Sequence, residues 1–206
     1  MNLRAHFINN QFYYILFLCC LISRIITSVY YIADIDSLRF AYSIVLEYDI
    51  SKLQPHFPGY AVFCFLGNIL YFFIGNLGLV FSVIGAISTF YIIYFSNKFL
   101  EYEINSLESY FLISLIIFNP LIWIMSNRYM PDLMGLALLT ISLLYLIKTI
   151  KYNYKINFIM LGVFLGFLAG VRLSFIPFFL PVIFLIKNKN FKYTCLYFVL
   201  SILIWL

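Results

Sequence analysis

The chain has 206 residues, of which 65% are hydrophobic and 10% are charged, and its formal net charge is +5. Soluble domains are about 45–50% apolar and about 25% charged, so this composition excludes a soluble globular protein, a disordered chain and a nucleic-acid-binding domain. Several apolar runs approach or exceed the roughly 20 residues that a helix needs to cross a bilayer core. The sequence therefore predicts an all-α, multi-pass integral membrane protein.

In chain order, the first predicted span is Phe12–Tyr31, and the longest polar interval, Ala33–Pro58, follows it. Three further runs are long enough to cross a membrane on their own: Leu77–Phe95, Ser109–Met125 and Leu133–Ile147. The next run, Phe158–Ile186, is longer than one crossing requires, and Phe191–Leu206 is still apolar where the chain stops. We therefore expect residues 1–206 to be one membrane-embedded helical module, truncated at its C-terminus and part of a larger protein.

Two lysine clusters set the expected orientation of these spans. The clusters lie within Lys148–Lys155 and Lys187–Lys192, and basic loops favour the cytoplasmic side. The acidic interval Ala33–Pro58 is then placed outside, so an odd number of crossings must separate it from the first cluster. The three full-length candidates supply that number if the short apolar run Gly59–Ile74 lies at the outer surface or re-enters. We predict that this run does not cross.

The same reasoning divides Phe158–Ile186 into two parts. As a single helix it would be about 43 Å long, against a hydrocarbon core of about 30 Å, and it would put the lysine clusters on opposite sides. Two short helices broken near Gly170–Ser174 satisfy both constraints. Gly162, Gly166 and Gly170 recur at four-residue spacing, which predicts a face on which neighbouring helices approach closely.

This topology brings a short set of ionisable residues to the outer side. Asp36 lies just past the first span, Asp132 opens the fourth, and Arg172 lies at the expected break. Charged groups at the edge of hydrocarbon are costly unless they are paired or functional, so these positions are the first candidates for a site. The four cysteines lie inside apolar runs without the spacing of a metal or redox motif, and we assign them to packing.

Asp36 has two interpretations. The residues after Ser37 follow an amphipathic pattern that predicts a helix lying on the membrane surface. Asp36 with Ser37 suits the start of that helix, where a carboxylate caps free backbone amides. The functional alternative is a general base at the membrane edge, able to deprotonate a hydroxyl group.

The segment Pro55–Tyr60 is the least loop-like part of the outer interval. Two prolines flank a histidine and an aromatic residue, so we expect a stiff, extended backbone before the next apolar run. One interpretation is a rigid turn that only feeds a surface helix. The other is that His56 and Tyr60 are held over a site where they donate hydrogen bonds to a phosphate.

The second outer turn, residues 127–132, also allows two interpretations. Pro131 and Asp132 suit the first turn of a helix, where the helix dipole favours a carboxylate. Arg128 and Arg172 are suited to neutralise an anionic group, because a planar guanidinium is always charged and matches phosphate geometry. Ordinary ion pairs between these arginines and neighbouring aspartates are the structural alternative.

The layout resembles the membrane-embedded GT-C glycosyltransferases, in particular the protein O-mannosyltransferase-like group. The first span leads directly into a long outer loop with an early aspartate, Asp34-Ile35-Asp36, followed by Phe40-Ala41. A Pro-His-x-Pro-Gly-Tyr stretch, Pro55–Tyr60, then precedes a juxtamembrane helix. An outer turn with an aspartate, Met130-Pro131-Asp132, opens a later span, and a glycine-rich hairpin, Gly166–Arg172, carries a basic residue.

The resemblance implies a polytopic helix bundle whose long first extracytoplasmic loop carries juxtamembrane helices, here as the N-terminal part of a larger enzyme. Such an enzyme transfers a hexose-type sugar, mannose in the group itself, from a polyprenyl-phosphate donor to a hydroxyl acceptor on the extracytoplasmic face, with inversion. The family often has proline after the Gly-Tyr pair, where this chain has Ala61. The spacing to Phe40 favours Asp36 over Asp34 as the match to the family's loop aspartate.

The resemblance also implies roles for individual residues. The implied site residues are Asp36 or Asp34 as the base, Arg128, Arg172, His56 and Tyr60 around the lipid phosphate, and Asp132 as the residue that positions the acceptor or a divalent metal. No other cofactor is expected. The expected partners are the lipid-linked sugar donor and membrane lipids, without nucleic acid, and the oligomeric state stays open.

A polytopic transporter or a flippase for lipid-linked sugars is the main alternative, because such proteins also place sparse charges near helix breaks. A transporter is expected to place these charges nearer the midplane of the membrane and to show internal repeats, and we find no repeat in the sequence. A structural subunit of a membrane complex is the third interpretation.

Overall fold

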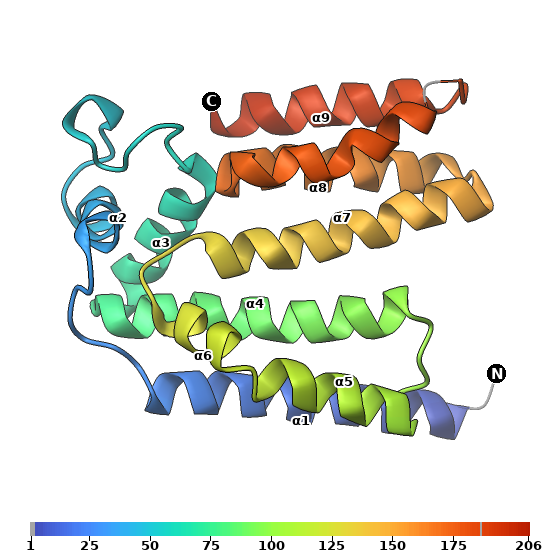
Figure 1. Ribbon diagram of the computed structural model, residues 1–206, viewed down its shortest axis with the longest axis horizontal. Coiled ribbons are helices and arrows are strands. Elements are labelled where there is room, and N and C mark those ends of the chain that lie inside the picture. The colour runs from blue at the N-terminus through green and yellow to red at the C-terminus, as the bar shows by residue number, and fades with distance from the viewer. Residues whose placement is uncertain (1–2, 186) are drawn as a thin grey trace.

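A computed structural model describes residues 3–185 and 187–206, and these form helices, with one isolated bridge between Asp49 and Gln54 as the only strand-type pairing among them. The long helices lie side by side, and α2 lies at one end, on the left in Figure 1. The α-helices are α1 (Leu3–Ile26), α2 (Ile35–Val45), α3 (Ala61–Ile74), α4 (Leu77–Phe99), α5 (Leu107–Ile117), α6 (Pro120–Asn127), α7 (Asp132–Tyr152), α8 (Lys155–Val171) and α9 (Phe191–Trp205). Two 3₁₀ helices are η1 (Ile50–Lys52) and η2 (Leu173–Leu185). The prediction of an all-α chain is thus confirmed for the described residues.

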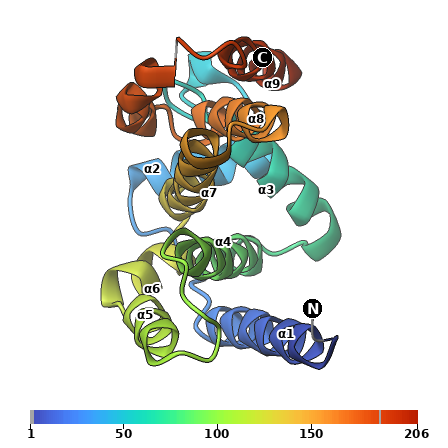
Figure 2. The same ribbon diagram turned by 90° about the vertical axis from the view of Figure 1, so that its right-hand side faces the viewer.

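Helices α4 and α7 are each long and apolar enough to cross a membrane, and α5 with α6 is a third candidate if the pair is one bent span. The end-on view shows α1, α5 and α6 on one side of α4, and α7, α8 and α9 on the other (Figure 2). Helix α3 has 14 residues and is about 21 Å long, which is short of the roughly 30 Å hydrocarbon core. The described residues therefore hold two or three helices that are fit to span a membrane by length and composition.

The predicted span Ser109–Met125 is not one continuous helix, because the chain bends by 54° between α5 and α6. The Asn119 side chain accepts hydrogen bonds from the backbone amides of Leu121 and Ile122 at 2.9 and 3.2 Å, which caps α6. Pro120 begins α6, and its missing N–H prevents α5 from continuing. The Asn-Pro pair is thus the local cause of the bend.

The first helix also ends earlier than predicted, at Ile26 instead of Tyr31. The hydroxyl of Thr27 donates to the Ser23 carbonyl at 2.9 Å, and that of Ser28 donates to the Ile25 carbonyl at 2.8 Å. Side chains of this kind satisfy the last carbonyls of a helix and so favour its end. The chain from residue 29 is therefore free to run across the end of the bundle toward α2.

The expected break after the glycine-rich helix is present. Helix α8 ends at Val171 and η2 begins at Leu173, so Arg172 stands between them. A Cβ added at Gly162 would lie 2.4 Å from the Thr194 carbonyl oxygen of α9. The glycine face therefore lets α8 and α9 approach to backbone distance, as predicted.

The two lysine clusters lie at the same end of the bundle, on the right in Figure 1. There the Asn188 amide donates to the Asn153 side-chain oxygen at 2.8 Å, which links the loop after α7 to the loop before α9. Lys151 forms an ion pair with Glu101 of the loop after α4. The segment 27–60, the turn at 128–131 and the break at Arg172 gather at the opposite end.

Buried aromatic rings fix α2 against this opposite end. Phe40 of α2 is fully buried and lies edge-to-face against Phe63 of α3, with ring centroids 5.5 Å apart. Phe63 packs in turn against Phe81 of α4, whose ring stacks on Tyr129 at 4.3 Å. Because these rings come from four segments, they hold the polar residues around α2 in fixed relative positions.

Candidate functional site

Asp34, and not Asp36, caps helix α2. Its carboxylate accepts hydrogen bonds from the backbone amide of Ser37 at 2.8 Å and from the Ser37 hydroxyl at 3.2 Å. The expectation that Asp36 forms the cap is therefore wrong. The capping residue must precede the first helical residue with an extended backbone, and Asp34, with φ −156°, is the residue that does so.

Arg128 reaches Asp34 from the turn between α6 and α7. Its Nε lies 3.1 Å from Asp34 Oδ2, and its Nη2 contacts the same oxygen. Burial raises the pKa of Asp34, but the hydrogen bonds from Ser37 and the charge of Arg128 outweigh burial and hold that pKa below its ordinary value. Arg128 thus fixes the start of α2 to the turn before α7.

Asp36 lies in the first turn of α2 and is the more open of the two carboxylates, with 42% of its side chain exposed against 26% for Asp34. Arg39, one helical turn later, donates from Nη1 to Asp36 Oδ1 at 3.0 Å. The Nδ1 atom of His56 approaches the same oxygen at 3.7 Å. Asp36 therefore combines an accessible carboxylate with two neighbours that can carry positive charge.

The segment that carries His56 turns sharply, so the expectation of an extended backbone is wrong. The backbone amide of Gly59 donates to the His56 carbonyl at 3.0 Å, which closes a turn, and Gly59 has φ +105°, a value that favours glycine. His56 Nε2 lies 3.1 Å from the Tyr60 hydroxyl. The chain then enters α3 at Ala61, so the segment does feed a short helix, and it also holds the imidazole against Asp36.

Arg172 and Asp132 form a further ion pair at this end of the bundle. Arg172 Nη2 lies 2.7 Å from Asp132 Oδ1, and the side chains are 27% and 25% exposed. The Arg172 guanidinium carbon lies 5.9 Å from the centroid of the Tyr60 ring. Burial raises the pKa of Tyr60, and the positive charge of Arg172 offsets part of that increase. A continuous chain of contacts therefore runs from Asp36 through His56, Tyr60 and Arg172 to Asp132.

The structure pairs both arginines that were expected to bind the phosphate with carboxylates. Arg128 contacts Asp34 with two nitrogens, and Arg172 contacts Asp132 with one. These are the ordinary ion pairs that the sequence analysis gave as the alternative to phosphate binding for both arginines. Arg172 Nε is buried and has no hydrogen-bond partner within the described residues, so Arg172 keeps an unused donor beside Tyr60.

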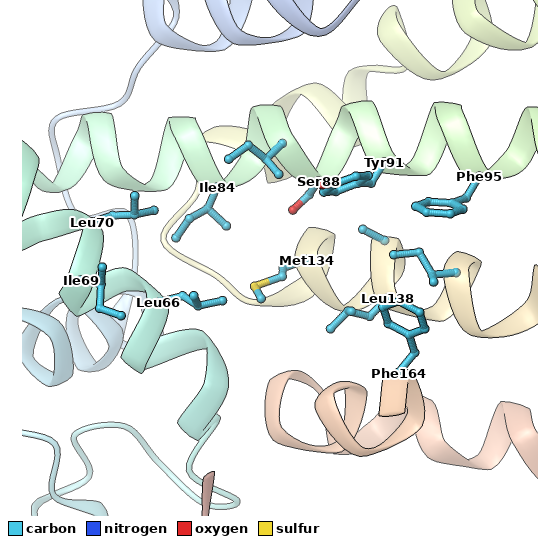
Figure 3. Close-up of a pocket in the computed structure, with 13 residues that line it drawn as sticks. Leu66, Ile69, Leu70, Ile84, Ser88, Tyr91, Phe95, Met134, Leu138 and Phe164 are labelled. Atoms are coloured by element: carbon cyan, nitrogen blue, oxygen red, sulfur yellow. The ribbon is translucent and has the colours of Figure 1, made fainter. Parts of the chain in front are cut away.

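Sequence reasoning missed an apolar cavity of about 500 Å³ between α3, α4, α7 and α8, which Figure 3 shows in close-up. A second cavity of about 520 Å³ shares Leu66, Met134 and Leu138 with it and extends to Ala61. Ala61 directly follows Tyr60, and Met134 lies two residues after Asp132. The apolar space therefore begins at the residues next to the polar chain of contacts.

Sequence reasoning also left Arg24 unexplained. This side chain is fully buried, with its guanidinium carbon 3.9 Å from the centroid of the Trp123 ring of α6. Its Nη2 approaches the Ile117 carbonyl oxygen, at the end of α5, at 3.5 Å. A cation at the C-terminus of a helix is favoured by the helix dipole, so Arg24 stabilises the bend between α5 and α6.

Among the residues that the structure describes, no group of three or more His, Cys, Asp or Glu side chains could hold a metal ion. Asp132, expected to position an acceptor or a divalent metal, is paired with Arg172 instead of with a second carboxylate. No protein-family model matches the sequence, and no curated protein or solved structure matches it either. What the molecule does must accordingly be inferred from its own residues.

Proposed function

We propose that the chain is the membrane module of a glycosyltransferase that transfers a hexose-type sugar from a polyprenyl-phosphate-linked donor to a hydroxyl acceptor. One observation carries the proposal: a largely buried Arg172–Asp132 pair, connected through Tyr60 and His56 to the open carboxylate of Asp36, adjoins a large apolar cavity. Such a site offers the three elements that the reaction needs, namely a lipid-binding space, a cation and a base.

The cavities suit the lipid part of the donor. Each is about 500 Å³, within the roughly 300–1,000 Å³ range of ligand pockets, and their linings are almost entirely apolar. A polyprenyl phosphate has a branched hydrocarbon chain and one anionic head. With the chain between α3 and α7, the head lies near the ends of these helices, where Arg172 offers a cation whose Nε has no hydrogen-bond partner within the described residues. A donor phosphate would either bind Arg172 together with Asp132 or displace Asp132 from Arg172.

The transfer step follows from this placement. Asp36 takes the proton of the acceptor hydroxyl, and the acceptor oxygen forms a bond to the anomeric carbon. The bond from that carbon to the phosphate oxygen breaks, and the phosphate leaves with the electron pair. Arg172 stabilises the charge that develops on the leaving phosphate. The expected inversion at the anomeric carbon rests on the GT-C resemblance alone.

The positive-inside rule supports an extracytoplasmic site. The lysine-rich loops and the polar chain of contacts lie at opposite ends of the bundle. If the lysine-rich end faces the cytoplasm, Asp36 and Arg172 face the opposite side of the membrane. Lipid-linked sugars of the polyprenyl-phosphate type would then be used from the outer leaflet.

The test is a turnover assay with the full-length protein in liposomes that contain a radiolabelled polyprenyl-phosphate sugar and a hydroxyl acceptor. A glycosyltransferase forms a labelled sugar product and releases polyprenyl phosphate. A flippase, the competing function that the lipid-sized cavity also favours, moves the donor between leaflets without forming a product. Donor translocation without product would replace the present proposal with that one.

A further inference from the structure

Both ring nitrogens of His56 lie near oxygen atoms of neighbouring side chains. Nε2 lies 3.1 Å from the Tyr60 hydroxyl oxygen. Nδ1 is buried, has no hydrogen-bond partner within the described residues, and lies 3.7 Å from Asp36 Oδ1. The imidazole ring is held edge-to-face by the fully buried Phe40 at 5.7 Å and by Tyr60 at 5.1 Å. The ring is therefore fixed with one nitrogen toward each side chain.

The chemistry of the two neighbours selects the imidazole tautomer. An ionised carboxylate only accepts hydrogen bonds, whereas a tyrosine hydroxyl can donate one. If Tyr60 donates to Nε2, the proton of the neutral ring lies on Nδ1 and faces Asp36. In the opposite tautomer the lone pair of Nδ1 would face the negative carboxylate, which is unfavourable. The contacts therefore favour the Nδ1–H form of His56.

We propose that His56 is a positioning residue for Asp36 and not a ligand of the donor phosphate, with Tyr60 fixing the tautomer that this role needs. The part of this inference that concerns catalysis rests on the proposed function, whereas the tautomer does not. Catalytic hydrogen bonds are often long in unliganded enzymes, so we expect the 3.7 Å approach to shorten when an acceptor is bound.

Other charged groups around the pair help to orient the carboxylate that the imidazole faces. Arg39 donates to the same Oδ1 atom of Asp36 that His56 faces, at 3.0 Å. The hydrogen bond and ion pairs of Asp36 within the described residues all involve Oδ1, which leaves Oδ2 to take the acceptor proton. On the far side of Tyr60 lies Arg172, whose charge is balanced by Asp132. His56 and Arg39 thus hold one oxygen of the base while the other reacts.

Nitrogen NMR reports which ring nitrogen of a histidine carries the proton, so it tests the tautomer directly. The chain has only two histidines, His6 and His56, so the signal of His56 can be isolated. In the full-length protein with any other histidine replaced and His6→Gln added, the ¹⁵N-histidine spectrum in nanodiscs reports His56 alone. The expected result at neutral pH is protonation on Nδ1, shifting toward the Nε2–H form in Tyr60→Phe. Protonation on Nε2 in the parent protein would overturn the inference, whatever the activity.

Two variants of His56 then separate the positioning role from phosphate binding. In His56→Asn, the side-chain amide nitrogen of the new asparagine lies near the position that Nδ1 occupied. In His56→Gln, the amide nitrogen of the new glutamine lies near the position that Nε2 occupied. We expect His56→Gln to lower kcat about ten- to a hundredfold with unchanged donor Kd, and His56→Asn to keep most of kcat. Weaker donor binding in both variants, with unchanged kcat, would instead mean that His56 is a ligand of the donor phosphate. If the parent protein transfers no sugar, the proposed function fails, and the NMR result still decides the tautomer.

Discussion

Replacement of Arg172 by alanine tests the cation of the proposed phosphate site. The structure predicts two separate effects. The Arg172–Asp132 pair is about three-quarters buried, so its burial is intermediate between that of surface pairs and that of fully buried pairs. Surface ion pairs contribute about 0–1 kcal/mol to stability, whereas breaking a buried pair costs about 3–5 kcal/mol. We therefore expect the free energy of unfolding to fall by about 1–3 kcal/mol. The second effect is on donor binding, where a charge-assisted contact contributes roughly 1.5–3 kcal/mol, or about ten- to a hundredfold in Kd.

The assay is binding of a fluorescent polyprenyl phosphate to the full-length protein in nanodiscs, measured beside thermal unfolding of the same samples. Arg172→Lys should recover part of the affinity, because a point charge remains while the two-pronged guanidinium geometry is lost. Arg128→Ala is the matched control, since it removes the same charge at the same end of the bundle. Arg128 is bound to the capping carboxylate of Asp34 by two nitrogens, so its loss should reduce stability more than donor affinity.

Equal donor affinity in the parent protein and in folded Arg172→Ala would refute this reasoning. Asp132→Asn provides a second check with the opposite sign. Because Asp132 occupies one nitrogen of Arg172 in the unliganded structure, its neutralisation should leave donor affinity unchanged or increase it. A loss of affinity in Asp132→Asn equal to that in Arg172→Ala would mean that the pair acts only as a structural brace.

Three further predictions concern the scaffold. Asp34 has a lowered folded-state pKa, so its stabilising effect is complete above its ordinary pKa of 3.8 and is lost as the pH falls through the folded value. The difference in unfolding free energy between the parent protein and Asp34→Asn should therefore be largest near neutral pH and shrink below about pH 4. Gly162→Ala should lower the unfolding free energy by about 1–3 kcal/mol, measured by denaturant titration, because the new methyl group would meet the backbone of α9. In a variant without native cysteines, Phe57→Cys should react with impermeant reagent from outside intact cells and Tyr154→Cys should not, and the reverse would invert the proposed orientation.

Much of the fold could be predicted from the sequence, because apolar run lengths and loop charges constrain a membrane helix strongly. The break at Arg172 followed from the excess length of Phe158–Ile186 and from the need to keep the lysine clusters together. The close approach of α8 and α9 followed from the glycine spacing. The bend at Asn119–Pro120 was missed even though this pair is a local signal for a helix start, since hydropathy alone cannot register it.

The site was less predictable, because its geometry depends on contacts between distant segments. Asp34 and Asp36 are two residues apart, and only the backbone conformation at Asp34 shows which of them caps α2. Arg128 and Arg172 have the same chemistry, and only the fold shows that each has its own aspartate partner. The apolar cavity left no signal in the sequence, because its lining residues, apart from Ser88, are ordinary apolar and aromatic residues of four helices.

The most direct test of the central claim is the turnover of the full-length protein with Asp36→Asn, measured as sugar transfer from a polyprenyl-phosphate donor. Asparagine cannot accept a proton at neutral pH, and Asp36 does not cap α2, so the variant should fold and bind donor normally. Loss of a general base should reduce turnover by roughly 10²–10⁴-fold, with Asp34→Asn much the milder change. Turnover in Asp36→Asn equal to that of the parent protein would contradict the assignment of Asp36 as the base.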